Sequence, residues 1–118
     1  MSTILWRLAG AVAAVALVAP APAPAEAQTP IKIGASLSLT GTYGKIGIHQ
    51  KEGYEVCADD LNAKGGLLGR KVEFVVYDDQ SMPATGVRLY EKLITEDKVD
   101  AVMGPYSSPI TEAVANVT

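Results

Sequence analysis

The sequence is poor in the residues that most often carry catalytic or metal chemistry. It has one cysteine, Cys57, and one histidine, His49, among 118 residues. A single cysteine excludes an intramolecular disulfide. A single histidine excludes a multi-histidine metal site and a serine–histidine–aspartate triad within this chain. We therefore expect no metal and no cofactor, and a role other than that of an enzyme.

Clustered positive charge is also lacking. Lys and Arg number 10 and Asp and Glu 13, which gives a formal net charge of −3. Nucleic-acid binding depends on grouped cations that neutralise phosphates, and no such group is visible along the chain. The sequence therefore predicts no nucleic-acid partner.

The one long apolar run lies near the N-terminus and is short for a membrane span. Residues 8–18 are 11 small apolar residues that follow Arg7, and a Pro/Ala segment then ends in Ala-Glu-Ala at 25–27. A membrane-spanning helix needs about 20 residues. The pattern is typical of a secretory signal peptide over residues 1–27. It predicts an exported mature chain, residues 28–118, that does not span the membrane.

The remaining sequence alternates between strand and helix patterns. β-Branched and alternating apolar residues predict strands over residues 30–39, 71–77 and 99–103. Helical spacing and Pro at early helix positions predict helices over 48–61, from 83 and from 109. This βαβαβα order predicts an α/β fold with a Rossmann-like parallel sheet and right-handed crossovers.

The first two helices each have an expected apolar face. These faces carry Tyr54, Cys57, Ala58 and Leu61 in the first helix and Val87, Tyr90 and Ile94 in the second. Because Cys57 falls within this pattern, we expect a small buried hydrophobe rather than a reactive thiol.

The fold predicts where a ligand would bind. In the usual strand order, strand 1 lies between strands 2 and 3, and the chain reverses direction between strands 1 and 3. Ligands of open α/β sheets bind outside the carboxyl ends of the strands at such a switch point. The candidate site is therefore formed by the loops at residues 40–47 and 104–109.

The chemistry of these loops suits a small solute with a carboxylate. Tyr106, Ser107 and Ser108 stand at a helix N-terminus, where free N–H groups and the helix dipole favour an anion. The alternative is that Ser108 only caps its own helix. Tyr43 could shield an apolar side chain, although a glycine-rich loop is often a plain turn. The candidate ligand-binding residues are Tyr43, Tyr106, Ser107 and Ser108.

Two aspartates follow the second predicted strand. We expect Asp78 and Asp79 to hydrogen-bond neighbouring backbone, at a place away from the switch point. Paired carboxylates can perform acid–base chemistry, but no nucleophile or metal-ligand cluster lies beside them in the sequence.

Nucleotide binding is the main competing interpretation, because a strand, a glycine-rich loop and a helix also outline a dinucleotide fold. Gly41, Gly44 and Gly47 give G-x-x-G-x-x-G rather than G-x-G-x-x-G. The phosphate-binding Walker pattern also fails, since Leu39 stands where its first glycine is needed. A nucleotide-binding α/β enzyme is therefore the weaker alternative.

Four segments resemble the leucine/isoleucine/valine-type periplasmic binding proteins, the branched-chain amino acid receptors of ABC importers. They are IKIGASLSLTGTYG at 31–44, DDLNAKGGLLGRKV at 59–72, YDD at 77–79 and GPYSSP at 104–109. The resemblance implies a type I periplasmic binding protein of two lobes, located in the periplasm. It also implies a membrane permease and an ATPase as partners, with an amino acid or related solute bound between the lobes.

The same resemblance assigns roles to residues. Ser108 would bind the ligand's α-carboxylate with Ser107 beside it, and Tyr43 would line the cleft. Residues 28–118 would then be the first part of a truncated N-terminal lobe. A ligand-sensing domain of a signalling receptor shares this fold and stays open as an alternative, and the identity of the solute is not encoded in these segments.

Overall fold

The computed structural model describes residues 28–118, so the predicted signal peptide lies outside the described residues. Strands and helices alternate in the predicted order. The elements are β1 (Ile31–Leu37), α1 (Gly44–Ala63), β2 (Val72–Asp78), α2 (Pro83–Thr95), β3 (Ala101–Met103) and α3 (Ser108–Val114). The βαβαβα prediction is confirmed.

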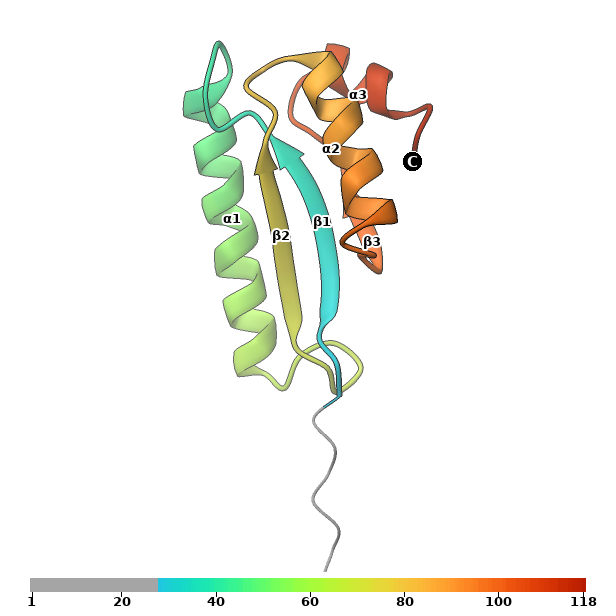
Figure 1. Cartoon of the computed structure of the whole chain (residues 1–118). Helices are drawn as coiled ribbons and strands as arrows, with labels where there is room; N and C mark the ends of the chain where they lie inside the picture. The colour runs from blue at the N-terminus through green and yellow to red at the C-terminus, as the bar shows by residue number, and fades with distance from the viewer. Residues whose placement is uncertain (1–27) are drawn as a thin grey trace, which may run out of the picture.

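The three strands form one parallel sheet in the order β2-β1-β3. Ile31 of β1 pairs with Val72 of β2, and Ile33 of β1 pairs with Ala101 of β3. The predicted central position of β1 is therefore confirmed. Because the strands are parallel, all three carboxyl ends lie at one edge of the sheet, at the top of Figure 1.

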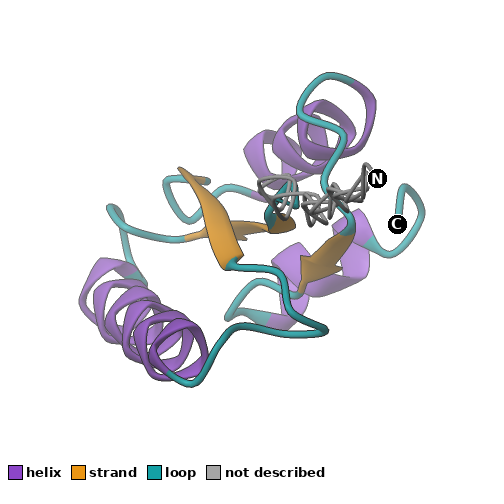
Figure 2. Ribbon diagram, turned by 90° about the horizontal axis from the view of Figure 1, so that it is seen from below, coloured by secondary structure: helices purple, strands orange, loops and turns teal. Residues whose placement is uncertain are grey.

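Helices cover the sheet on both faces, with α1 on one side and α2 on the other (Figure 2). Helix α3 packs against α2 through Ile110 and Val114. On the α1 side, the rings of Tyr54 and Phe74 stack with centroids 5.1 Å apart. Asn62 fixes the end of this helix, because its side chain donates to the Val72 carbonyl oxygen at 2.9 Å and accepts from Val72 N at 2.8 Å. The amide thus ties the C-terminal end of α1 to the start of β2.

The α2–α3 side contains the apolar core. Tyr90, Leu93, Ile110 and Val114 are buried there, and Tyr90 Oη donates to the Met103 carbonyl oxygen. Burial raises the pKa of Tyr90 to about 12.

One predicted core position in α2 is wrong. Ile94 is 40% exposed, whereas Leu93 is fully buried. The buried residues of α2 are Gly86, Tyr90 and Leu93, so Tyr90 agrees with the predicted stripe, whereas Leu93 takes the place of Ile94, which lies at the margin. Gly86 lies within the stripe because a Cβ there would approach Ile110 to 2.7 Å.

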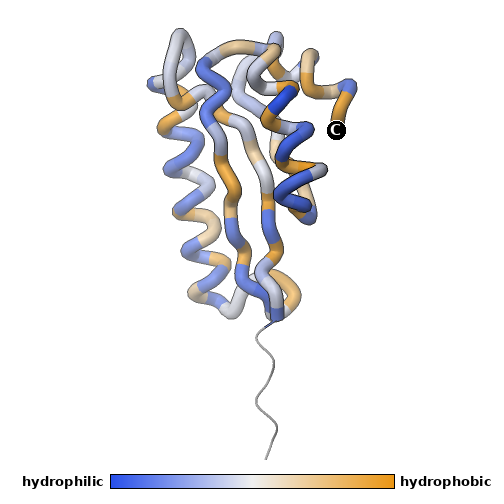
Figure 3. Tube along the Cα trace, viewed as in Figure 1, coloured by the Kyte–Doolittle hydropathy of each residue, from blue (hydrophilic) through white to orange (hydrophobic). Residues whose placement is uncertain are grey.

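The α1 side is packed more thinly, and hydrophilic residues recur along α1 in Figure 3. Ala58 and two glycines are the buried residues of this helix. Cys57 is exposed, so the prediction of a buried cysteine is wrong. Tyr54 and Ala58 face the sheet, and Cys57 lies about 100° around the helix from Ala58. No helix among the described residues is long and apolar enough to cross a membrane.

The first helix begins at Gly44 rather than at the predicted residue 48. Gly44 and Gly47 are buried where the first turn of α1 meets the carboxyl end of β1. A Cβ on Gly47 would overlap the Ser38 carbonyl oxygen. These glycines therefore permit close packing of helix on strand, and the loop that precedes them is shorter than predicted.

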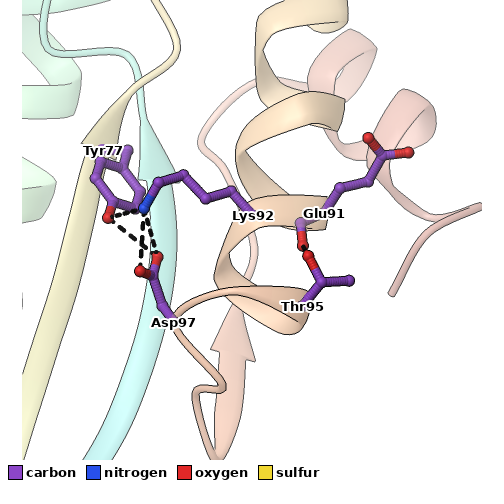
Figure 4. Close-up of polar contacts among 5 residues, drawn as sticks. All are labelled: Tyr77, Glu91, Lys92, Thr95 and Asp97. Carbon is purple, nitrogen blue, oxygen red and sulfur yellow. Dashed lines mark hydrogen bonds and ion pairs between the residues drawn. The ribbon is translucent and has the colours of Figure 1, made fainter.

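A polar cluster joins the C-terminal end of α2 to β2 (Figure 4). Lys92 Nζ donates to Tyr77 Oη at 2.5 Å and to both carboxylate oxygens of Asp97 at 3.0 Å. Hydrogen bonds from Lys92 to Tyr77 and Asp97 raise the pKa of Lys92, and the bond from Lys92 lowers the pKa of Asp97. The ammonium also lies 4.4 Å from the centroid of the Tyr77 ring.

Candidate ligand-binding site

Two tyrosines that are far apart in the sequence meet at the carboxyl edge of the sheet. Tyr43 follows β1 and Tyr106 follows β3, and their ring centroids lie 6.1 Å apart with an interplanar angle of 54°. This geometry lies within the range of favourable aromatic pairs. Tyr43 is half-buried and Tyr106 is 47% exposed. The pair therefore offers an accessible aromatic surface at the switch point between β1 and β3.

Ser107 and Ser108 stand beside this pair, at the start of α3. Ser107 is the N-cap residue, in an extended conformation, and its side chain makes no capping hydrogen bond. Ser108 is the first residue of the helix, so the alternative in which Ser108 caps α3 is wrong. The extended backbone of Ser107 places the helix boundary one residue earlier than the Ser-Pro pattern indicated.

The two serine hydroxyls differ in exposure. Ser108 is exposed, whereas Ser107 is 5% exposed. Ser107 Oγ is buried and has no hydrogen-bond partner among the described residues. A buried hydroxyl is normally paired, because leaving it unpaired costs free energy. Ser107 therefore has the capacity to bond a group supplied from outside these residues.

The local electrostatics favour a negatively charged group. The first turn of α3 carries no acidic residue, and its N-terminal N–H groups point out of the helix. Pro109 removes one of these donors, which leaves the hydroxyls of Ser107 and Ser108 as supplementary donors. A carboxylate would be held here by dipoles and hydroxyls rather than by a cation.

Sequence reasoning missed the contribution of Asp78 to this site. Its Oδ1 accepts from the backbone of Leu39 at 2.9 Å, Thr40 at 3.2 Å and Gln80 at 2.8 Å, and Oδ2 accepts from Thr40 Oγ1 at 2.7 Å. The bond from Gln80 confirms the expected local role. The bonds to Leu39 and Thr40 contradict the prediction that Asp78 lies away from the switch point, because they hold the loop that leads to Tyr43.

Hydrogen bonding decides the ionisation of Asp78. Partial burial opposes the charged form, but the bonds from the Thr40 hydroxyl and from the backbone of Gln80, Leu39 and Thr40 outweigh it. Together they hold the pKa of Asp78 below its ordinary value of 3.8. Asp78 is therefore a carboxylate that binds the loop through charge-assisted hydrogen bonds.

Asp79 lies beneath the same loop and is fully buried. Its carboxylate accepts from Ser36 Oγ at 3.0 Å, Ser38 Oγ at 2.6 Å and Ser81 N at 2.9 Å. The available signal was the alternation of Ser36 and Ser38 on one face of a strand that otherwise reads as apolar. The buried hydroxyls of Ser36 in β1 and Ser38 just after it require polar partners, and the carboxylate of Asp79, directly after the neighbouring strand, supplies them.

The site is an open surface rather than a closed pocket. No closed pocket and no cluster of metal-ligating side chains is found within residues 28–118. Tyr43, Tyr106, Ser107 and Ser108 carry no charged group among them. The arrangement can bind an amphipathic solute on one side, with aromatic rings for an apolar part and donors for an anionic part.

Comparison with known proteins identifies the family. The family described as periplasmic binding protein matches residues 30–118. The chain belongs to the periplasmic binding protein family. Over 87 residues it is 36% identical to the Leu/Ile/Val-binding protein BraC3 of Rhizobium johnstonii, with 74% of this chain and 23% of that protein covered.

Solved structures agree with this membership. The branched-chain amino acid transporter substrate-binding protein LivJ of Streptococcus pneumoniae, in complex with isoleucine, has a TM-score of 0.71 and 33% identity over 74% of this chain and 25% of that chain. A fatty acid ABC transporter substrate-binding protein of Thermomonospora curvata has a TM-score of 0.69 and 30% identity, covering 75% and 22%. The chain thus spans about a quarter of the length of the family members it matches.

Proposed function

We propose that the protein is the solute-binding receptor of an ABC importer and binds a branched-chain amino acid or a related small solute. The similarity to a Leu/Ile/Val-binding protein and to an isoleucine-bound transporter receptor supports this class of ligand. Residues 28–118 would be the first part of the N-terminal lobe. The solute would be held between this lobe and a second one, and the receptor would perform no catalysis.

The observation that carries the proposal is the meeting of the aromatic pair and the serine pair at one edge of the sheet. In the proposed complex, the start of α3 with Ser107 and Ser108 binds the α-carboxylate of the solute. Tyr43 and Tyr106, 6.1 Å apart, lie against its aliphatic part. An amphipathic amino acid matches both the serine pair, through its carboxylate, and the tyrosine pair, through its aliphatic part.

The proposed partners and location follow from the same role. Solute receptors of this type deliver cargo to a membrane permease driven by ATPase subunits, and we expect both as partners. The N-terminal pattern at residues 1–27 supports export to the periplasm as a protein with a cleaved leader.

Thermal unfolding of the complete gene product tests the ligand class. The protein is melted alone and with leucine, isoleucine, valine, a fatty acid or a nucleotide. A ligand at 100 times its Kd stabilises by about 2.7 kcal/mol, which gives a clear rise in Tm. A rise with the aliphatic amino acids supports the proposal. A rise only with the fatty acid changes the cargo, and a rise only with nucleotides overturns the receptor assignment.

Ser108→Ala tests the carboxylate position. Losing one hydrogen bond to a charged group costs about 1.5–3 kcal/mol, so the Kd for isoleucine should rise at least about tenfold. Ser108→Thr keeps a hydroxyl and should retain most of the affinity. Thr95→Ala serves as the control, because within residues 28–118 its hydroxyl bonds only the Glu91 carbonyl oxygen, at 2.7 Å on α2. Unchanged affinity in Ser108→Ala would remove this residue from the site.

A further inference from the structure

The turn between β2 and α2 contains backbone strain that its sequence does not require. Gln80 and Ser81 are consecutive non-glycine residues in the left-handed region, with φ values of 57° and 62°. Residues other than glycine rarely adopt this region, because their Cβ crowds the backbone. Such strain persists only where surrounding contacts enforce it, and it concentrates at functional sites.

The two aspartates enforce this conformation. Asp78 Oδ1 accepts from Gln80 N at 2.8 Å, and Asp79 Oδ1 accepts from Ser81 N at 2.9 Å. The Asp79 carbonyl oxygen accepts from Met82 N at 3.0 Å and closes the turn. Each strained residue is thus held by its own N–H group, and its side chain is free to act elsewhere.

The Ser81 side chain acts on the neighbouring loop. Ser81 Oγ donates to the Thr40 carbonyl oxygen at 2.8 Å and accepts from Tyr43 N at 3.0 Å. Gly41, with φ of 78°, lies so close that a Cβ would meet Gln80 O at 2.6 Å and Ser81 Oγ at 2.8 Å. One hydroxyl therefore bridges both sides of the short bend that carries Tyr43.

We propose that Ser81 is a positioning residue that fixes Tyr43 opposite Tyr106. The left-handed backbone of Ser81 aims its hydroxyl into the bend between Thr40 and Tyr43, and this contact is what the strain maintains. The Tyr43 backbone is thereby held where its ring lies 6.1 Å from the ring of Tyr106. The effect on a ligand rests on the proposed function, whereas the effect on the loop does not.

Amide hydrogen exchange of the complete gene product tests the positioning without any ligand. Ser81→Gly removes the hydroxyl. Because glycine also relieves the backbone strain at this position, the fold should be retained. Exchange at the Tyr43 amide should accelerate at least about tenfold, as expected when a hydrogen bond worth about 1.4 kcal/mol is removed. The Thr111 amide, which donates to Ser107 O at 2.9 Å, should not change. Ser81→Ala should give the same Tyr43 result. Unchanged exchange at Tyr43 in both variants would overturn the proposal.

A double-mutant cycle then tests the consequence for binding, with isoleucine as the probe. Ser81→Gly should weaken isoleucine binding by about tenfold in the parent protein and cause no further loss in a Tyr43→Ala background. Additive losses would mean that Ser81 does not act through Tyr43. If the parent protein does not bind isoleucine, the proposed function fails, and the exchange result alone decides whether Ser81 positions the loop.

Discussion

The α2–α3 face and the carboxyl edge of the sheet are stabilised by different forces. On the face, Tyr90, Leu93, Ile110 and Val114 exclude water by apolar packing. At the edge, the segments that follow β1 and β2 are joined by carboxylates, hydroxyls and backbone N–H groups. Packing is non-directional and provides most of the stability, whereas hydrogen bonds fix geometry. The rigid face thus serves as the support on which the edge holds its side chains in place.

The largest expected effect comes from opening the packed face. Leu93→Ala removes a fully buried side chain and should lower the free energy of unfolding by about 2–5 kcal/mol. Ile94→Ala, at the neighbouring position that is 40% exposed, should cost less than about 1 kcal/mol. Denaturant unfolding of both variants measures the difference. Equal losses would mean that the buried stripe includes Ile94, as the sequence pattern predicted.

A smaller loss of stability is expected where the first turn of α1 packs against the carboxyl end of β1. Gly47→Ala places a Cβ against the Ser38 carbonyl oxygen, and such overpacking typically costs about 1–3 kcal/mol. Gly53→Ala is the matched control in the same helix, because nothing lies within 4 Å of its added Cβ. That change should stabilise the protein by about 0.5–1 kcal/mol. Opposite signs in thermal melts would confirm that close packing, rather than helix propensity, requires Gly47.

The difference between the two regions also explains what the sequence could predict. Strand and helix order follow from local periodicity, and strand order follows from general rules for parallel sheets, so both were predicted correctly. Burial at single positions depends on how each helix is rotated against its neighbours. Leu93 and Ile94 are both apolar, and the sequence does not show that Leu93 is the one that packs against Gly34 of β1, where an added Cβ would lie 2.9 Å from its side chain. The predicted burial of Cys57 is wrong for the same reason, because only a narrow face of α1 contacts the sheet.

The candidate site was predictable in position but not in its internal contacts. The switch-point rule located the loops that carry Tyr43 and Tyr106. The support from Asp78 and Ser81 was missed because it joins loops about 40 residues apart, and no local pattern encodes such a contact. The N-cap was placed one residue late, since Ser107 and Ser108 are chemically identical and only the backbone conformation distinguishes them.

A moderate and pH-dependent effect is expected at the polar edge. Asp78→Asn removes the charge that binds Leu39 and Thr40, so the free energy of unfolding should fall by about 1–2 kcal/mol. The folded-state pKa of Asp78 is below 3.8, so its contribution is fully present above that value and disappears as pH falls through the folded pKa. Unfolding measured from pH 7 down to pH 2 should show the parent and the variant converging in acid. A difference that persists at pH 2 would mean that shape rather than charge is lost.

The smallest effect is expected from the half-buried ion pair at the C-terminal end of α2. Lys92→Met removes the bonds to Tyr77 and Asp97, but both charges are accessible to water and salt. Because the pKa of Lys92 is raised in the folded state, its contribution to stability is fully present below about pH 10.5 and is lost as pH rises through the folded pKa. Because the pKa of Asp97 is lowered, its contribution to stability is fully present above about pH 3.8 and is lost as pH falls through the folded pKa. The small Tm difference between parent and variant should therefore be flat between these limits and shrink with added salt. A loss as large as that of Leu93→Ala would mean that charge, and not packing, holds α2 against the sheet.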